Sequence, residues 1–168
     1  MKILKNVTSI LAAIMIAVNV FTCSTASAEE FVSSTNDTAS LYISRDKVVT
    51  GSKISLGLSA GQKGKSNEVK LNVSGIPDDA ELTKITIVGT NASMSGDGLT
   101  IATSVTLVAP NGRKYTNSWG VGNKIEITNF YHEETNGDWT LYFEGQNVAS
   151  SGYSVLSYTP RVTFSYRS

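Results

Sequence analysis

The stretch NGDWTLYFE, residues 136–144, decides the fold. It opens as a turn, because Gly137 adopts backbone conformations that a side chain would obstruct. It then alternates: Trp139, Leu141 and Phe143 are each followed by a more polar residue, Thr, Tyr and Glu in turn. A period of two places successive side chains on opposite faces of a β-strand. The stretch therefore predicts a strand whose buried face carries Trp139.

The same period recurs along the chain from residue 40 onward. Clusters of Gly, Pro, Asn and Asp separate the runs and supply the turns. No stretch of helical period is long enough to predict a helix. Ser- and Thr-rich strands joined by short turns indicate an all-β domain, an antiparallel sandwich of two sheets. Further strands are predicted at Val69–Val73, Ile85–Val88, Val105–Leu107, Ile125–Ile127 and Val162–Tyr166.

The first 28 residues are typical of a secretory signal peptide. Lys2 and Lys5 precede a short apolar run, residues 10–21, and Ala26-Ser27-Ala28 offers a small-x-small cleavage site. The run is too short to span a bilayer, and no later segment is apolar enough to do so. We therefore expect a secreted, extracellular protein without a transmembrane segment.

After the leader, residues 29–39 are polar and are expected to form a flexible N-terminal arm, followed by a β-sandwich domain at 40–168. Cys23 leaves two interpretations open. It is the lipid-bearing residue of a bacterial lipoprotein signal, although Val20-Phe21-Thr22 matches that pattern poorly, or it is removed with the leader. We favour removal, which leaves the mature domain without a disulfide and dependent on its core for stability.

The charge balance excludes one class of partner. The sequence carries 14 basic and 14 acidic residues, and the leader takes Lys2 and Lys5 with it. The mature net charge is then about −2, and no stripe or run of Lys and Arg is present. A nucleic-acid partner is therefore not expected.

The segment SAGQKGKS, residues 59–66, resembles a phosphate-binding loop. That loop begins with Gly, where this chain has Ser59, and it requires a following helix whose N-terminus holds the phosphate. The residues that follow, Glu68 to Val73, have the pattern of a strand. We therefore interpret the segment as a hairpin tip and not as a nucleotide site.

Residues 132–138, HEETNGD, form the most polar segment. Oxygen ligands from Glu133, Asp138 and Asp97 are candidates for a calcium site, although no regular twelve-residue calcium loop is present. The lone His132 provides too few nitrogen ligands for a structural zinc site. A solvated turn between strands is the interpretation that we prefer, so no cofactor is expected and calcium is the one alternative.

Catalysis has little support in the sequence. His132 is the only histidine and is the candidate general base, but no Gly-x-Ser-x-Gly motif accompanies it. The sequence contains carboxylates that could serve in sugar hydrolysis, but their positions in the sequence do not show that any two face one substrate. We expect a protein that is not an enzyme, with a hydrolase as the minor alternative. The carboxylates in question are Asp78, Asp79, Glu81, Glu133 and Glu134.

Aromatic residues supply the candidate binding surface. Trp139 is assigned to the core because it lies within an alternating strand. Trp119 lies in a turn region, where it is either a lid on the core or a ligand contact. Aromatic rings contribute large contact areas at low entropic cost. The ligand-binding residues predicted from the sequence are therefore Trp119, Tyr131, His132 and Glu133.

Residues 76–168 resemble the P domain, or Homo B domain, that follows the catalytic domain of proprotein convertases and subtilisin-like proteases. The family's most recognisable stretch reads Gly-Glu, three residues, Gly, any residue, Trp-Thr-Leu. Glu133, Gly137 and Trp139-Thr140-Leu141 match it, with His132 in place of the first Gly. Other matching pieces are Ile85–Val88 before Gly96-Asp97, Val105–Val108 running into Ala109–Arg113, and Arg161–Tyr166.

This resemblance implies a jelly-roll-like sandwich. In the family, the domain supports the folding and stability of an adjoining protease domain. No protease domain precedes residues 76–168 here, so we do not expect this role within the same chain. We therefore expect a secreted binding or accessory module that recognises an extracellular protein or a cell-surface glycan. The alternative is a toxin-like or antimicrobial effector, in which the alternating strand Leu99–Leu107 inserts into membranes after oligomerisation.

Overall fold

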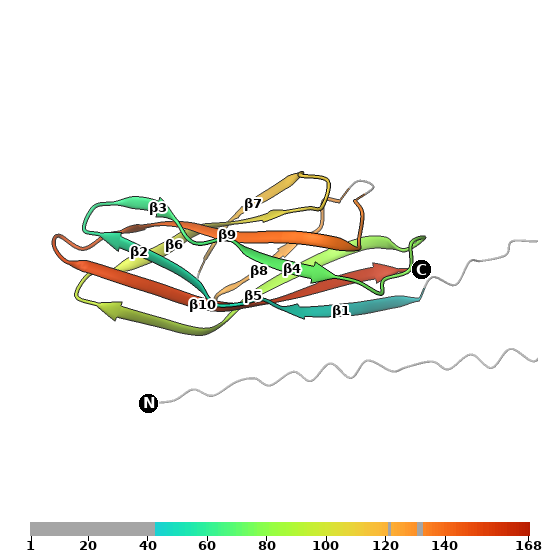
Figure 1. Cartoon of the computed structure of the whole chain (residues 1–168), viewed down its shortest axis with the longest axis horizontal. Coiled ribbons are helices and arrows are strands. Elements are labelled where there is room, and N and C mark those ends of the chain that lie inside the picture. The colour runs from blue at the N-terminus through green and yellow to red at the C-terminus, as the bar shows by residue number, and fades with distance from the viewer. Residues whose placement is uncertain (1–42, 121, 131–132) are drawn as a thin grey trace, which may run out of the picture. The chain divides into compact units, whose positions relative to one another are not determined.

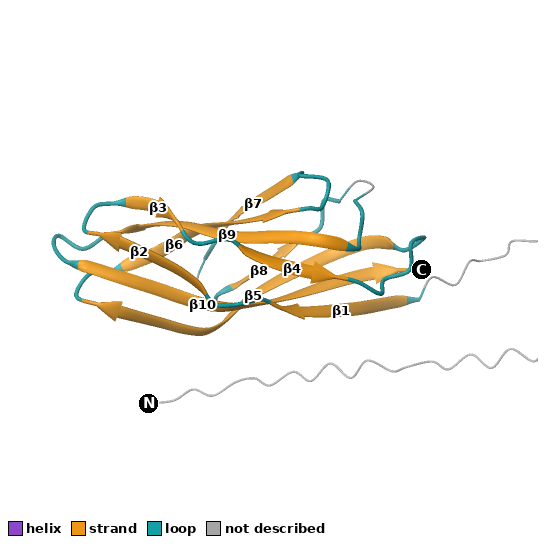
Figure 2. Cartoon of the chain, viewed as in Figure 1, coloured by secondary structure: helices purple, strands orange, loops and turns teal. Residues whose placement is uncertain are grey.

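Two antiparallel β-sheets pack against each other as a sandwich (Figure 1). The computed structural model describes residues 43–120, 122–130 and 133–168, all within one compact unit, Ala39–Ser168. Strands and loops, without helices, make up this described part (Figure 2). The predicted all-β, two-sheet antiparallel sandwich is confirmed, and its jelly-roll-like connectivity stays a prediction.

Each sheet has five strands. The first, which we name the β10 sheet, contains β1 (Ser44–Thr50), β2 (Ile54–Ser59), β5 (Glu81–Gly96), β8 (Lys124–Ile127) and β10 (Tyr153–Arg167). Its order is β1-β10-β5-β8, and β2 also pairs with β10. The second, the β9 sheet, contains β3 (Lys63–Lys65), β4 (Val69–Val73), β6 (Thr100–Val108), β7 (Lys114–Ser118) and β9 (Gly137–Asn147). Its order is β3-β9-β6-β7, and β4 also pairs with β9.

The predicted leader, residues 1–28, and the predicted arm, residues 29–39, lie outside the described residues. Within the described ranges, no helix has the length and apolar character needed to cross a membrane.

The core lies between the sheets and is centred on β9. Trp139, Leu141 and Phe143 are buried there, as the alternation predicts. The Trp139 ring packs against Phe164 of β10 with 5.2 Å between ring centroids, and its Nε1–H donates to the Thr135 carbonyl at 3.2 Å. The assignment of Trp139 to the core is confirmed.

Turns carry the chain from one sheet to the other. The SAGQKGKS segment forms the turn from β2 to β3, which lie in different sheets, so it is not a hairpin tip; strand β4 follows it instead of a helix, as predicted. The buried side chain of Asn147 joins neighbouring turns: its Oδ1 accepts the Leu99 N–H at 3.1 Å and its Nδ2 donates to the Leu58 carbonyl at 2.9 Å. These turns therefore form one connected end of the sandwich.

Strand β6 contains a β-bulge that the sequence does not predict. Ala102 pairs with Gly145 and Ser104 pairs with Glu144, so Thr103 has no residue opposite it. An extra residue reverses the faces of all the side chains that follow it. The expectation of one apolar face from Leu99 to Leu107 is therefore wrong. Val105 and Leu107 are fully buried, whereas Leu99 and Ile101 are 44% and 38% exposed.

The shortness of β7 and β8 leaves half of the sandwich uncovered along one side. β8 pairs only with Ile85–Val88 of β5, and β7 pairs only with Ser104–Val108 of β6. Beyond them, no strand in the described ranges pairs with the outer edges of β5 at 90–96 or of β6 at 100–102. In Figure 1 this uncovered half lies away from the C-terminus, on the left.

Candidate functional site

The structure separates the residues that were predicted to bind a ligand. Glu133 contacts Arg113 and Tyr115 at the beginning of β7, whereas Trp119 follows the end of that strand. The intervening length of β7 is roughly 15 Å at about 3.3 Å per residue. Tyr131 and His132 lie outside the described residues. Trp119 and Glu133 therefore belong to two different places on the molecule.

Glu133 has a buried side chain whose carboxylate is held by several donors. Its oxygens accept from Asn111 Nδ2 at 2.6 Å and from Arg113 Nη1 at 2.9 Å, and also from the Tyr115 hydroxyl. Burial, and then the hydrogen bond to this carboxylate, raises the pKa of Tyr115. Buried carboxylates need such compensation because they have lost water. Through these contacts Glu133 stabilises the packing of its own segment against the β6–β7 turn.

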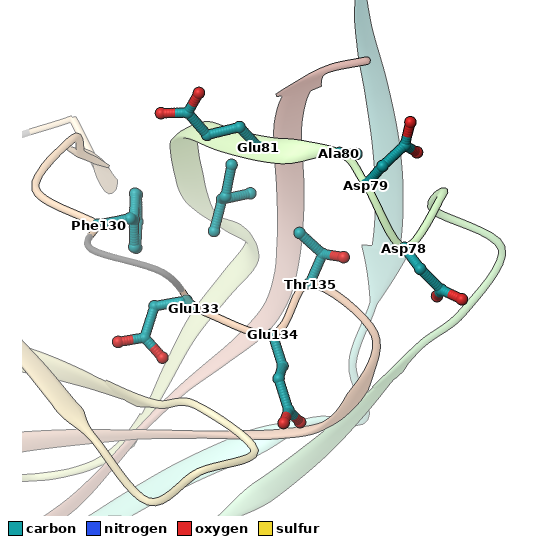
Figure 3. A pocket seen from close by; sticks show the side chains of 9 residues that line it. Asp78, Asp79, Ala80, Glu81, Phe130, Glu133, Glu134 and Thr135 are labelled. Carbon is teal, nitrogen blue, oxygen red and sulfur yellow. The ribbon is translucent and has the colours of Figure 1, made fainter.

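A pocket of about 650 Å³ lies beside Glu133 (Figure 3). Its lining is acidic, but the labelled carboxylates point in different directions. Glu81 is moreover bound by Arg167 Nε at 2.8 Å and Nη2 at 2.5 Å. The pocket thus lacks the two facing carboxylates that glycoside hydrolysis needs. The acidic side chains concerned are Asp78, Asp79, Glu81, Glu133 and Glu134.

The predicted calcium ligands are not brought together. Asp138 is at the beginning of β9, where it accepts from Asn72 Nδ2 at 2.9 Å. Asp97 is in the β5–β6 turn near the other end of β9, and its Oδ1 accepts the Tyr153 N–H at 2.9 Å. This bond is the main cause of the lowered pKa of Asp97. At about 3.3 Å per residue, β9 places the two carboxylates roughly 30 Å apart.

One ion bound by both Asp97 and Asp138 is therefore incompatible with this distance. Calcium binding by Asp97, Glu133 or Asp138 separately stays a prediction. Among the side chains that the structure describes, no three His, Cys, Asp or Glu residues are grouped as metal ligands.

A second, more open hollow of about 420 Å³ lies on the uncovered half of the sandwich. Met94 of β5, Leu99 of the β5–β6 turn and Ile101 of β6 line it, and all three are exposed, Met94 to 49%. Leu156 and Tyr158 of β10 also line it and are buried. We name this surface the β5–β6 groove. It exists because β7 and β8 do not extend along β5 and β6 as far as the turn between them.

Trp119 also lines this groove, although its side chain is only 6% exposed. Its ring meets Phe143 and Tyr158 edge-on, with centroid distances of 4.7 and 5.8 Å. Of the two interpretations that the sequence left open, the packing is that of a core lid. Its Nε1–H is buried and has no hydrogen-bond partner among the described residues, unlike that of Trp139. A buried donor without a hydrogen-bond partner costs about 1–3 kcal/mol.

Sequence reasoning missed the groove as a site. Leu99 and Ile101 were noticed only as part of an alternating strand, and Met94 stands alone among polar residues. The available signal was the pair of apolar residues flanking a Gly-Asp-Gly turn.

The chain was compared with protein families and with curated proteins. No protein-family model matches this chain, and no curated protein matches it.

Proposed function

We propose that this protein is an extracellular, non-enzymatic binding module that recognises another protein by holding an extended segment of it in the β5–β6 groove. The observation that carries the proposal is the position of the groove. An apolar floor lies between two strand edges, at 90–96 and 100–102, that pair with no described strand on their outer sides.

An unpaired strand edge offers backbone N–H and C=O groups to an incoming strand. Proteins commonly guard such edges with Lys or Pro, and neither occurs in the segments TNASMSG, residues 90–96, and TIA, residues 100–102. The groove beside these edges accepts the alternate side chains of an added strand, which gives specificity.

The same features favour a protein over a glycan. Sugars stack on open aromatic faces, whereas Trp119 is packed edge-on against Phe143 and Tyr158 and is almost fully buried. The Thr100 hydroxyl in the groove is also hydrogen-bonded within the fold, because it is 2.8 Å from the Ser154 hydroxyl. An extended peptide requires only the edges and the apolar floor.

The proposal is tested with random peptides displayed on phage and selected against the immobilised protein. The selected peptides are then measured against an Ile101→Glu variant, with Val48→Glu as the matched control. Val48 is 43% exposed and lies on β1, outside the groove. We expect Ile101→Glu to weaken binding about tenfold or more, equivalent to about 1.4 kcal/mol, and Val48→Glu to leave it unchanged.

Strand addition is tested separately by methylating alternate backbone nitrogens of a selected peptide. In one set the N–H groups face the protein edge, and in the other they face solvent. Only one set should lose affinity. Equal effects of the two sets, or equal effects of the two Glu variants, would contradict the proposed function.

A further inference from the structure

We infer that the pocket beside Glu133, which we name the acidic pocket, is a second binding site. Its ligand is an organic cation with several N–H groups on an aliphatic stem, as in the side chains of arginine and lysine and in polyamines. The acidic pocket is formed by the beginning of β5 and the segment before β9, away from the β5–β6 groove. The inference therefore does not depend on the proposed function.

The lining of the acidic pocket carries unbalanced negative charge. Five carboxylates line it, and no Lys or Arg does. Arg113 pairs with Glu133, and Arg167 pairs with Glu81. A hollow lined by one sign of charge attracts ions of the opposite sign. Three of the lining carboxylates form no ion pair with any side chain that the structure describes, namely Asp78, Asp79 and Glu134.

The hydroxyl of Thr135 is a second observation that points to a ligand. Thr135 lines the pocket and is only 6% exposed. In Figure 3 its side chain extends toward the segment that carries Asp79 and Ala80. Its carbonyl accepts the Trp139 Nε1–H, but its hydroxyl has no hydrogen bond to any described residue. Polar groups in such positions normally have a partner, and an N–H donor in the pocket provides one.

The size of the pocket and the spread of its carboxylates decide the kind of cation. A calcium ion needs oxygen ligands that converge on it at about 2.3–2.6 Å. Here the carboxylates point in different directions around a space of about 650 Å³. Such a volume is in the range of pockets that hold small organic molecules. A guanidinium group directs its N–H donors to several sides and can therefore meet acceptors that lie apart.

Apolar side chains provide the remaining walls of the pocket and suit an aliphatic stem. They belong to Ala80, Leu82 and Phe130. Phe130 is itself packed against Tyr115, with 5.1 Å between the ring centroids. Long cationic side chains bury their methylene groups on apolar surface while the charged end stays with polar groups, and aromatic rings also attract cations. The pocket therefore favours an organic cation over an inorganic one.

The inference is tested by titrating the isotope-labelled protein with N-acetylarginine amide and recording amide chemical shifts. We expect saturable shifts at Leu82 and Thr135, with a dissociation constant of about 1 mM for a ligand of this size. Affinity should fall as salt is added, because salt screens the carboxylates. N-acetylcitrulline amide, in which a neutral urea replaces the guanidinium, should bind about tenfold more weakly or not at all.

Two substitutions locate the binding site. Glu134→Gln should weaken binding of N-acetylarginine amide about threefold. Its matched control is Glu144→Gln, which removes an exposed carboxylate on β9 outside the pocket and should change nothing. Thr135→Val should weaken binding about tenfold and Thr135→Ser should retain it, because only the serine keeps a hydroxyl. Urea unfolding of each variant verifies that it is folded, and the glutamine pair decides if Thr135→Val is not.

Spermidine in place of N-acetylarginine amide distinguishes the source of the cation. Tighter binding of spermidine assigns the pocket to free polyamines, and tighter binding of the arginine derivative assigns it to a side chain of a polypeptide. Equal binding of the arginine and citrulline derivatives, equal effects of the two glutamine variants, or no saturable shift at the pocket overturns the inference. Ile101→Glu should leave this binding unchanged, so failure of the groove and failure of the pocket are seen separately.

Discussion

At the scale of single residues, the two tryptophans show how similar side chains acquire different roles. Trp139 is fully buried and its Nε1–H is satisfied by Thr135, whereas Trp119 is nearly as buried without an acceptor among the described residues. A buried donor that is satisfied contributes to stability, and one that is not detracts from it. The unsatisfied N–H of Trp119 thus slightly lowers the stability of the domain.

Phenylalanine substitutions measure this difference. Both Trp139→Phe and Trp119→Phe remove ring volume. Only Trp139→Phe also removes a hydrogen bond, which leaves the Thr135 carbonyl without its donor. We expect Trp139→Phe to lower the free energy of unfolding by about 1 kcal/mol more than Trp119→Phe does. Urea unfolding followed by circular dichroism gives both values. A larger loss for Trp119→Phe would show that its N–H has a partner in the free protein.

Asp97 provides a pH-dependent test at the same scale. Its pKa is lowered in the folded protein because its carboxylate accepts backbone hydrogen bonds, first from Tyr153. A depressed folded pKa contributes stability above the unfolded value of about 4, and this stability is lost as the pH falls through the folded pKa. Asp97→Asn should therefore be less stable than wild type at pH 7 and equal to it in strong acid. A difference in urea midpoint that does not decrease as the pH is lowered would contradict this explanation.

At the scale of elements, the bulge in β6 depends on its neighbour in β9. A Cβ added at Gly145 would collide with the Ile101 carbonyl oxygen and lie 2.7 Å from Leu56 Cδ2. Gly145 therefore permits the close approach that the bulged strand makes. The bulge in turn directs Ile101 out toward the groove and Val105 into the core.

Gly145→Ala should consequently destabilise the domain by about 1–3 kcal/mol through overpacking. Gly120→Ala is the matched control, because a Cβ there meets nothing within 4 Å. Chemical denaturation of the two variants makes the comparison. Equal stabilities would mean that β6 and β9 can move apart without cost.

The distribution of apolar residues on the faces of each strand explains which strands the sequence predicts. β4, β8 and β9 were predicted because one face of each is apolar and turns flank them. β2 carries the same signal in Ile54, Leu56 and Leu58, which was overlooked. β1 and β7 could not be found in this way, since SRDKVVT and KYTNS place polar residues on both faces. Their pairing comes from neighbours distant in the sequence.

At the scale of the whole molecule, the candidate site follows from unequal strand lengths. β5 and β6 extend beyond the strands β7 and β8 that flank them, and the β5–β6 groove is the space left beside them. Local patterns do not report such differences, because they depend on which strands pair and in what register. Glu133 was predicted to bind a ligand because local patterns also do not report its partners within the fold. Its partners Asn111 and Arg113 are 22 and 20 residues away in the sequence.

The length of β10 has a mechanical consequence for the domain. β10 runs the full length of the sandwich, and its ladder with β1 contains seven residue pairs, from Ser44 with Arg167 to Thr50 with Arg161. Tension applied between residue 43 and the opposite end of the sandwich acts along β1, parallel to that strand. All seven pairs then bear the force together in shear, instead of opening one after another. The domain is thus built to resist stretching along β1 and β10.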